Sequence, residues 1–224
     1  MTAALAATEI CVFDAYGTLF DFNSAVARHR AAIGPKADAL ADLWRAKQIQ
    51  YTWLRNGMGA YDKFWQVTGE ALDHCLAAHG IADAGVREKL MRAYLALDPF
   101  PEVPAMLDRL TRAGKRLAIL SNGDQDMLEA AGPYIGFRFD HVISVEQAGY
   151  FKPHWKSYAK AAEIIGENRS GILFVANHAF DCIGAKSCGM RTAFVDRRNR
   201  PFGRTPHQPD LVVADFAELA AMLA

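Results

Sequence analysis

The chain has 224 residues, and its 25 lysines and arginines balance 25 aspartates and glutamates, so the formal net charge is zero. This length suits one full hydrophobic core with an inserted subdomain better than two equal domains that fold independently. No basic run stands out, which argues against a nucleic-acid partner and favours a small organic substrate.

Cysteine spacing and hydropathy indicate the compartment. The four cysteines, Cys11, Cys75, Cys182 and Cys188, show no C-x-x-C spacing and are too few for a disulfide framework, so we expect reduced, packed thiols. The N-terminal MTAALAATEI lacks a basic segment ahead of an apolar stretch, and no apolar run approaches the roughly 20 residues of a membrane span. We therefore expect a cytoplasmic protein with no membrane partner.

The first predicted element is a buried strand, EICVF at 9–13, and the next plausible strand does not arrive until Leu117. From Asn23 to Leu97 the apolar spacing is helical, with expected breaks at Gly57, Gly59 and Gly80. We predict an α-helical cap inserted after the first strand. The segment Asp98-Pro99-Phe100-Pro101 then returns the chain to the core, because each proline disfavours helix in the residue before it.

Short apolar runs recur in the second half of the chain: LAIL at 117–120, HVISV at 141–145, ILFVA at 172–176, TAFV at 192–195 and LVV at 211–213. Helical stretches separate them, such as 101–114, where Pro101 suits a first turn and Gly114 a C-cap. Residues 196–210, rich in Arg, Pro and Gly, are predicted to form a surface loop.

Strands that alternate with helices predict an α/β fold with a doubly wound parallel sheet. We expect a Rossmann-like core formed by residues 1–20 and 99–224, and an inserted α-helical cap formed by residues 21–98. In such a sheet, ligands bind at the carboxyl ends of the strands.

Polar residues follow four of these strands. They are Asp14-Ala15-Tyr16-Gly17-Thr18, Ser121-Asn122-Gly123-Asp124, Lys152 in Phe151-Lys152-Pro153, and Asn177-His178-Ala179-Phe180-Asp181. A buried carboxylate beside a lysine is held ionised by the opposite charge. Because an ionised carboxylate in a dry pocket is a competent nucleophile, we expect Asp14 to be one.

The motifs FDAYGTLFD, LSNGD, FKP and FVANHAFD resemble, in this order, the four motifs of the haloacid dehalogenase superfamily, over nearly the whole chain. Phosphatases of that superfamily have a second aspartate, a general acid, where this chain has Tyr16. Halide leaves without a proton whereas an alkoxide requires one, so the missing acid favours dehalogenation. Asp181 is the only nearby acid in the fourth motif, which serves Mg²⁺ poorly, so we predict no metal and no cofactor.

The segment LWRAKQIQYTWLRNGMGAYDKFWQVTGEAL at 43–72 resembles the L-2-haloacid dehalogenases. The resemblance implies that L-2-haloacids are hydrolysed to D-2-hydroxy acids and halide, after Asp14 attacks the α-carbon with inversion and forms an ester. It further implies a small haloacid as the binding partner and is compatible with a homodimer.

The resemblance also implies a role for each site residue. Arg45 and Asn122 would hold the halide, Phe64 and Phe180 would form apolar walls, and Tyr16 would contact the substrate. Thr18, Ser121 and Lys152 would orient Asp14 and the substrate carboxylate, and Tyr158 would hydrogen-bond in the same network. Asp181 and Lys152 would position the hydrolytic water.

The fourth motif departs from the family pattern. Many members have Ser-Asn before Ala-Trp-Asp, whereas this chain has Asn177-His178 before Ala179-Phe180-Asp181. A histidine here could donate a hydrogen bond to halide, help to deprotonate water, or serve only as a hydrogen-bonding support. Donation to halide would favour a small, strongly hydrogen-bonding leaving group, which makes fluoroacetate a candidate substrate.

Other interpretations remain open on the sequence. Asp14 could be a turn aspartate and Arg45 a solvated helix residue. A phosphatase-like hydrolase of the same superfamily, or a non-catalytic binding protein on the same fold, would also suit the pattern. Tyr16 argues against the phosphatase, and the presence of both Asp14 and Lys152 argues against the binding protein.

Overall fold

The structure is a computed structural model that describes residue 5 and residues 8–224. Its centre is a six-stranded sheet in the order β5-β4-β1-β6-β7-β8, and all five strand pairings are parallel. The strands are β1 (Ile10–Phe13), β4 (Arg116–Ser121), β5 (His141–Ser144), β6 (Ile172–Ala176), β7 (Arg191–Val195) and β8 (Leu211–Val213). The predicted doubly wound α/β fold is confirmed.

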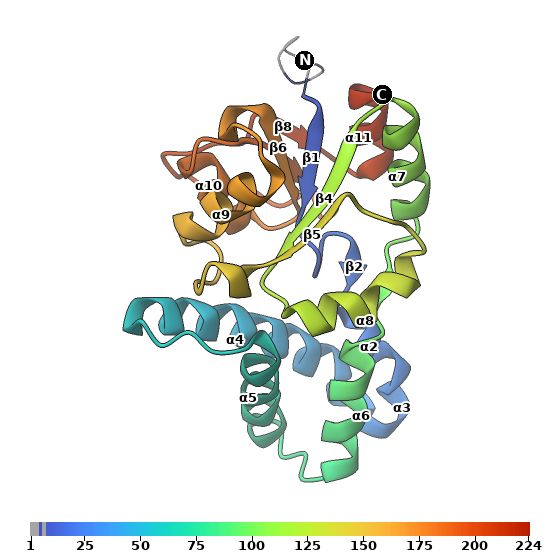
Figure 1. Ribbon diagram of the computed structural model, residues 1–224. Helices are drawn as coiled ribbons and strands as arrows, with labels where there is room; N and C mark the ends of the chain where they lie inside the picture. Colours follow the sequence, from blue (N-terminus) through green and yellow to red (C-terminus); the bar gives the residue numbers. More distant parts are fainter. Residues whose placement is uncertain (1–4, 6–7) are drawn as a thin grey trace.

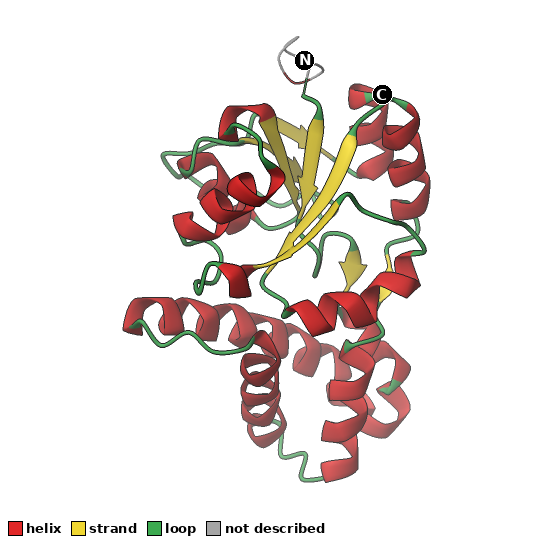
Figure 2. Cartoon of the chain, in the orientation of Figure 1, coloured by secondary structure: helices red, strands yellow, loops and turns green. Residues whose placement is uncertain are grey.

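Helices cover both faces of this sheet (Figure 2). They are α7 (Val103–Arg112), α8 (Gln125–Ile135), α9 (Trp155–Ile165), α10 (Ala179–Ser187) and α11 (Phe216–Leu223), with short 3₁₀ turns η2 (Val145–Gln147) and η3 (Arg169–Gly171). Every residue of β1 and β6 is buried, because helices cover both faces of the sheet, and this burial explains their continuous apolar runs.

Residues 196–210 contain no helix or strand, as predicted for a loop. Helix α7 begins at Val103, two residues later than expected from Pro101.

Residues 23–94, here called the helical segment, form α2 (Asn23–Arg28), α3 (Arg30–Ile33), η1 (Gly34–Lys36), α4 (Ala37–Met58), α5 (Phe64–Ala78) and α6 (Ala84–Tyr94). Figure 1 shows α4 crossing beneath the carboxyl ends of β1 and β4, with α5 and α6 beyond it. The expected break at Gly57 is wrong: α4 continues to Met58 and ends at Gly59, whose φ of 64° is the left-handed conformation that glycine adopts without strain. The division into domains at 21–98 stays a prediction.

Two short strands connect the core with the helical segment. Strand β2 (Phe20–Asp21) pairs antiparallel with β3 (Asp98–Pro99), which brings the two connections to the helical segment side by side. Arg28 supports this pairing by donating to the Ala96 carbonyl and to the Asp98 carboxylate. The sequence did not predict this pair, because two residues are too few to show strand alternation.

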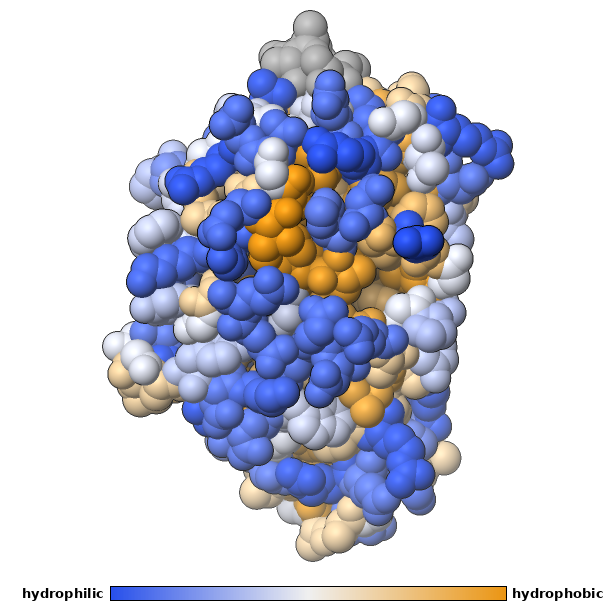
Figure 3. All heavy atoms as spheres, in the orientation of Figure 1, coloured by the Kyte–Doolittle hydropathy of each residue, from blue (hydrophilic) through white to orange (hydrophobic). Residues whose placement is uncertain are grey.

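The edge of the sheet at β5 is less well covered than its centre. Figure 3 shows apolar side chains gathered near β4 and β5 among polar ones. A cavity of about 300 Å³ lies there and is lined by Ile119, Leu128, Phe137, Phe139 and Val142 among others. Within residue 5 and residues 8–224, no helix combines the length and the hydropathy needed to cross a membrane.

Candidate active site

A buried ion cluster lies at the carboxyl end of β1, between β4 and β6. The Lys152 ammonium donates to Asp14 Oδ1 at 2.8 Å, to Asp181 Oδ2 at 2.7 Å and to the Leu120 carbonyl at 3.0 Å. Asp14, Lys152 and Asp181 are all buried. Three hydrogen bonds satisfy the ammonium group, and its single positive charge is shared between the two carboxylates, which lowers the cost of burying the three groups.

The two carboxylates have different acidities. Burial would raise the pKa of Asp14, but the charge of Lys152 and the nearby His178 more than offset it and hold this pKa well below its ordinary value. Burial raises the pKa of Asp181 to about 6 against the lowering effect of Lys152, and the negative charge of Asp14 adds to the rise. At neutral pH, Asp14 is therefore the more firmly ionised carboxylate of the two.

Hydroxyl groups fix the orientation of both carboxylates. Thr18 Oγ1 donates to Asp14 Oδ2 at 2.7 Å and accepts from the Asn177 backbone N–H at 3.0 Å. Tyr158 OH donates to Asp181 Oδ1 at 2.5 Å. The Asn177 side chain donates to the Val195 carbonyl, so the contact of Asn177 with Thr18 runs through its backbone.

His178 and Arg45 form the boundary of the site. Arg45 Nη2 donates to the Tyr16 carbonyl at 2.8 Å and lies 3.3 Å from His178 Nε2. Because a guanidinium group only donates, His178 Nε2 must accept, and burial together with Arg45 lowers the pKa of His178 and keeps the ring neutral. The ring proton is therefore on Nδ1, which faces Asp14 Oδ2 at 3.6 Å.

Gly17 makes room for this histidine. Its φ is 92°, and a Cβ atom at this position would lie 2.5 Å from His178 Cε1. Any side chain at position 17 would therefore strain the backbone and displace His178.

Most of the predicted site residues line one small cavity of about 10 Å³. They are Asp14, Tyr16, Arg45, Phe64, Ser121, Asn122, Lys152 and Phe180, joined by Ile49 and Thr52 from α4, which the sequence did not single out. The rings of Tyr16 and Phe64 stack at 6.0 Å, and Trp53 packs edge-on against Phe180 at 5.4 Å. The lining therefore combines one carboxylate, two cationic groups and apolar walls.

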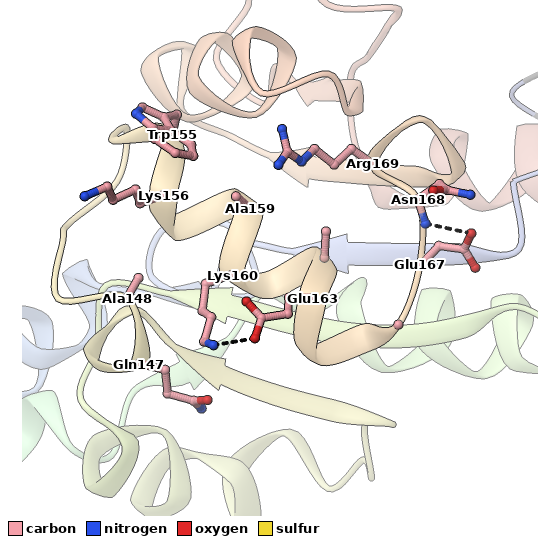
Figure 4. Close-up of a pocket in the computed structure, with 12 residues that line it drawn as sticks. Gln147, Ala148, Trp155, Lys156, Ala159, Lys160, Glu163, Glu167, Asn168 and Arg169 are labelled. Carbon is pink, nitrogen blue, oxygen red and sulfur yellow. Dashed lines mark hydrogen bonds and ion pairs between the residues drawn. The ribbon is translucent and has the colours of Figure 1, made fainter.

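A much larger cavity of about 780 Å³ lies along α9 (Figure 4). Charged side chains at its lining pair with one another, as Lys160 does with Glu163 at 2.6 Å. None of the residues predicted for the site line it. The volume of a cavity therefore does not identify the active site of this protein.

Two side chains that the sequence analysis did not assign to the site hold the helical segment against the core. Asn56 on α4 donates to the Phe151 carbonyl at 2.7 Å and accepts from the Phe151 N–H at 2.9 Å. In return, Asp124 of the core accepts from the N–H groups of Phe64 and Trp65 at 2.8 Å each, at the start of α5. We call these contacts the two clamps. A polar residue in a loop or on a helix shows no pattern that identifies such a distant partner.

The Asn56 clamp acts on the neighbour of Lys152, whose own N–H donates to Asn122 Oδ1 at 2.8 Å. We expect Asn56→Ala to lower kcat about tenfold and stability by about 2 kcal/mol, because two backbone groups lose their partners and the ammonium shifts. A displaced ammonium also lets the pKa values of both Asp14 and Asp181 rise, so the acid limb of the pH profile should move to higher pH. Gln50→Ala, an exposed change on the same helix, is the control, and an unchanged pH profile for Asn56→Ala would contradict the expectation.

Within the part of the chain that the structure describes, no three His, Cys, Asp or Glu side chains are grouped to hold a metal ion. The cation that lies between Asp14 and Asp181 is the Lys152 ammonium itself. Lys152 therefore occupies the position between the two carboxylates and supplies a positive charge there.

Comparison with known proteins agrees with this geometry. The profile of the haloacid dehalogenase-like hydrolases matches residues 8–189. The (S)-2-haloacid dehalogenase of Pseudomonas sp. (strain YL) is 41% identical over 207 residues, which are 91% of this chain and 89% of that protein.

Solved structures are similar over almost the whole chain. A dehalogenase solved with an intermediate complex has a TM-score of 0.94 and 36% identity over 97% of this chain and 98% of its own. The L-2-haloacid dehalogenase of Xanthobacter autotrophicus with chloropropionic acid covalently bound has a TM-score of 0.87 and 35% identity, and the match covers 96% of this chain and 97% of that chain. The chain therefore belongs to the haloacid dehalogenase-like hydrolases and, within them, to the (S)-2-haloacid dehalogenases.

Proposed function

We propose that this protein hydrolyses small L-2-haloalkanoic acids to D-2-hydroxy acids and halide, with Asp14 as the nucleophile. The observation that carries the proposal is a buried carboxylate kept ionised by Lys152 and enclosed by Arg45, Asn122 and apolar rings. Tyr16, whose ring lies against Phe64, supplies no acid for an alkoxide leaving group. A phosphatase reaction is therefore less well served by these residues than dehalogenation.

In the first step, an Asp14 carboxylate oxygen attacks the α-carbon of the substrate in line with the carbon–halogen bond. The new C–O bond forms as the C–X bond breaks, and halide leaves with the bonding electron pair. Arg45 and Asn122 stabilise the departing charge as hydrogen-bond donors in a site with little water. Ser121 and Lys152 orient the carboxylates, and Phe64 and Phe180 enclose the carbon chain.

In the second step, water attacks Cγ of the Asp14 ester. Asp181 takes a proton from this water and gives it to the substrate oxygen as the bond from Cγ to that oxygen breaks, which releases the 2-hydroxy acid. The Asp14 carboxyl group then loses a proton to solvent and is again a carboxylate. The covalently bound chloropropionic acid in the similar Xanthobacter autotrophicus enzyme supports an ester of this kind. The pKa of Asp181, raised to about 6, suits a group that accepts a proton near neutral pH.

His178 orients the groups around it in this arrangement. Its Nε2 accepts from Arg45 and its Nδ1–H faces Asp14, so both ring nitrogens are directed at the two groups that would meet the halide and the α-carbon. A turn of Arg45 toward the halide would release Nε2 as a proton acceptor. Fluoroacetate stays among the candidate substrates because a tight, donor-rich halide site favours fluoride.

The test is halide release from L- and D-2-chloropropionate, chloroacetate and fluoroacetate in the presence of EDTA, with Asp14→Asn as control. Chelator-resistant release of halide from the L-enantiomer that disappears in the variant supports the proposal. Release of phosphate from phosphate esters in the presence of Mg²⁺, without halide release, would favour the phosphatase instead. Chloride release without fluoride release would exclude the fluoroacetate hypothesis alone.

The different acidities of the two carboxylates predict which step becomes slow in acid. Below a pH of about 6, Asp181 becomes protonated and ester hydrolysis slows, whereas Asp14 stays ionised and continues to be alkylated. We expect the ester to accumulate at pH 5, visible as an added mass on the peptide containing Asp14 after an acid quench. Equal amounts of ester at pH 5 and pH 8 would show that Asp181 is not the proton acceptor.

We also propose a homodimer and a cytoplasmic location. Trp53, Leu54 and Met58 of α4 are about half exposed or more, and such an apolar group supports an interface between two copies. The four cysteines are buried free thiols, which suits a reducing compartment. Light scattering on the purified protein measures the oligomeric state, and a monomer mass would contradict the dimer.

A further inference from the structure

The cavity at Asp14 is too small for a haloacid, but a second cavity lies directly behind its boundary. The first has a volume of about 10 Å³ and the second about 380 Å³, and Arg45 and Ile49 line both. His178 lines the second cavity, and its Nδ1 lies 3.6 Å from Asp14 Oδ2. The side chains of Arg45 and His178 therefore form the partition between the two spaces.

Charged residues of the loop after β7 line the second cavity, here called the anteroom. Its charged lining consists of Arg45, Arg198 and Arg200 with Asp42 and Asp196. Arg197, which lies between Asp196 and Arg198 in the sequence, does not line the anteroom. It pairs with Glu102 at 2.8 Å and stacks on Phe100 at 3.9 Å. Three arginines against two aspartates leave the anteroom with an excess of positive charge, and both loop arginines are exposed to solvent.

The partition is held more weakly than the rest of the boundary. Among the described residues, Arg45 Nε has no hydrogen-bond partner, and the hydrogen-bond contacts of the guanidinium group are the Tyr16 carbonyl and His178. The two clamps, in contrast, each join α4 or α5 to the core by a pair of short hydrogen bonds. A rotation of Arg45 away from His178 breaks these two contacts and the stacking of its guanidinium group on the Phe22 ring at 5.1 Å, whereas lifting the helices breaks the four hydrogen bonds of the clamps.

We propose that the anteroom is a separate binding site for small carboxylates, where Arg198 and Arg200 hold the haloacid before it passes Arg45 to reach Asp14. This inference rests on the proposed function for the identity of its ligand. The same arginines would attract the released halide and guide it from Asp14 to solvent through the anteroom. The anteroom contributes to capture of the substrate and not to the bond-breaking steps.

The test compares the double variant Arg198→Glu/Arg200→Glu with Arg138→Glu/Arg204→Glu, which changes the net charge equally at exposed positions that do not line the anteroom. For L-2-chloropropionate at low ionic strength, we expect kcat/KM of the anteroom variant to fall about tenfold, with kcat unchanged. In the parent protein kcat/KM should fall as ionic strength rises, and in the anteroom variant this dependence should be lost or reversed, because the lining then carries an excess of negative charge. The control variant should keep the parent values.

A second measurement does not require turnover. Propionate, which has the carboxylate but no leaving group, is titrated into the parent protein and both variants at low ionic strength and followed by NMR. Weaker binding of propionate in the anteroom variant alone supports the site, and equal binding in all three proteins overturns it. A parent protein that releases no halide would refute the proposed function, and the propionate titration would still decide whether the anteroom binds carboxylates.

Discussion

Asp14→Asn is expected to reduce halide release by about 10⁴-fold or more while the protein stays folded. Asparagine has nearly the same shape, so Thr18 keeps a partner at this position. The amide carries no charge, however, and is a far weaker nucleophile than a carboxylate. The measurement is chloride release from L-2-chloropropionate, with circular dichroism to confirm folding. Asp126→Asn, at an exposed aspartate of α8, is the matched control.

The same nucleophile can be identified in the unchanged protein. In a single turnover in H₂¹⁸O with enzyme in excess, the label is expected in the Asp14 carboxylate and not in the 2-hydroxy acid, because water attacks Cγ of the ester. Label in the product after one turnover would mean that water attacks the α-carbon directly and that Asp14 acts only as a base. The two routes differ in which atom receives the water oxygen, so mass spectrometry of the peptide and the product distinguishes them.

Lys152→Met is expected to have the second largest effect. It leaves Asp14 and Asp181 buried without their counter-charge, which should destabilise the protein by about 3 to 5 kcal/mol at pH 7. We expect kcat to fall by on the order of 10³-fold, because the Asp14 nucleophile loses the charge that holds it ionised and in place. Urea unfolding and chloride release measure the two effects.

The pH dependence of this variant follows from the carboxylates. Without the ammonium, burial raises the pKa of both carboxyl groups above their values in the unfolded chain, so the folded state binds protons more readily. The stability lost in Lys152→Met should therefore be partly regained as the pH is lowered from 8 to 5. The control is Lys160→Met, which removes an exposed ion pair with Glu163 and should change stability by less than about 1 kcal/mol. A loss of stability that does not vary with pH would contradict the ion-cluster argument.

The strands of the core could be predicted from the sequence because a sheet covered on both faces requires unbroken apolar runs. ILFVA at 172–176 matches β6 residue for residue, and LAIL lies within β4. The residues after these strands could be predicted to meet, since carboxyl ends of parallel strands lie at one edge of the sheet. Lys152 and Asp14, 138 positions apart, form an ion pair at 2.8 Å for this reason.

Features that depend on the packing of distant segments could not be predicted in this way. The pair β2 and β3 has no alternation to detect, and Gly57 is tolerated inside α4 because the helix is held by its contacts with the rest of the protein. The sequence contains Asn177 in the expected motif, but only the structure shows that its side chain donates to the Val195 carbonyl. Ile49 and Thr52 line the site through the placement of α4 alone.

The two clamps have a consequence for how this protein can be recombined or evolve. Asn56 of the helical segment supplies both partners for one core peptide, and Asp124 of the core supplies both partners for the start of a helix in that segment. Each part therefore completes the backbone hydrogen bonding of the other. A chimera that receives its helices from a different relative would keep these bonds only if the new helices carry an asparagine at the position of Asn56 and seat their backbone against Asp124. The two parts therefore form a matched pair and not interchangeable modules.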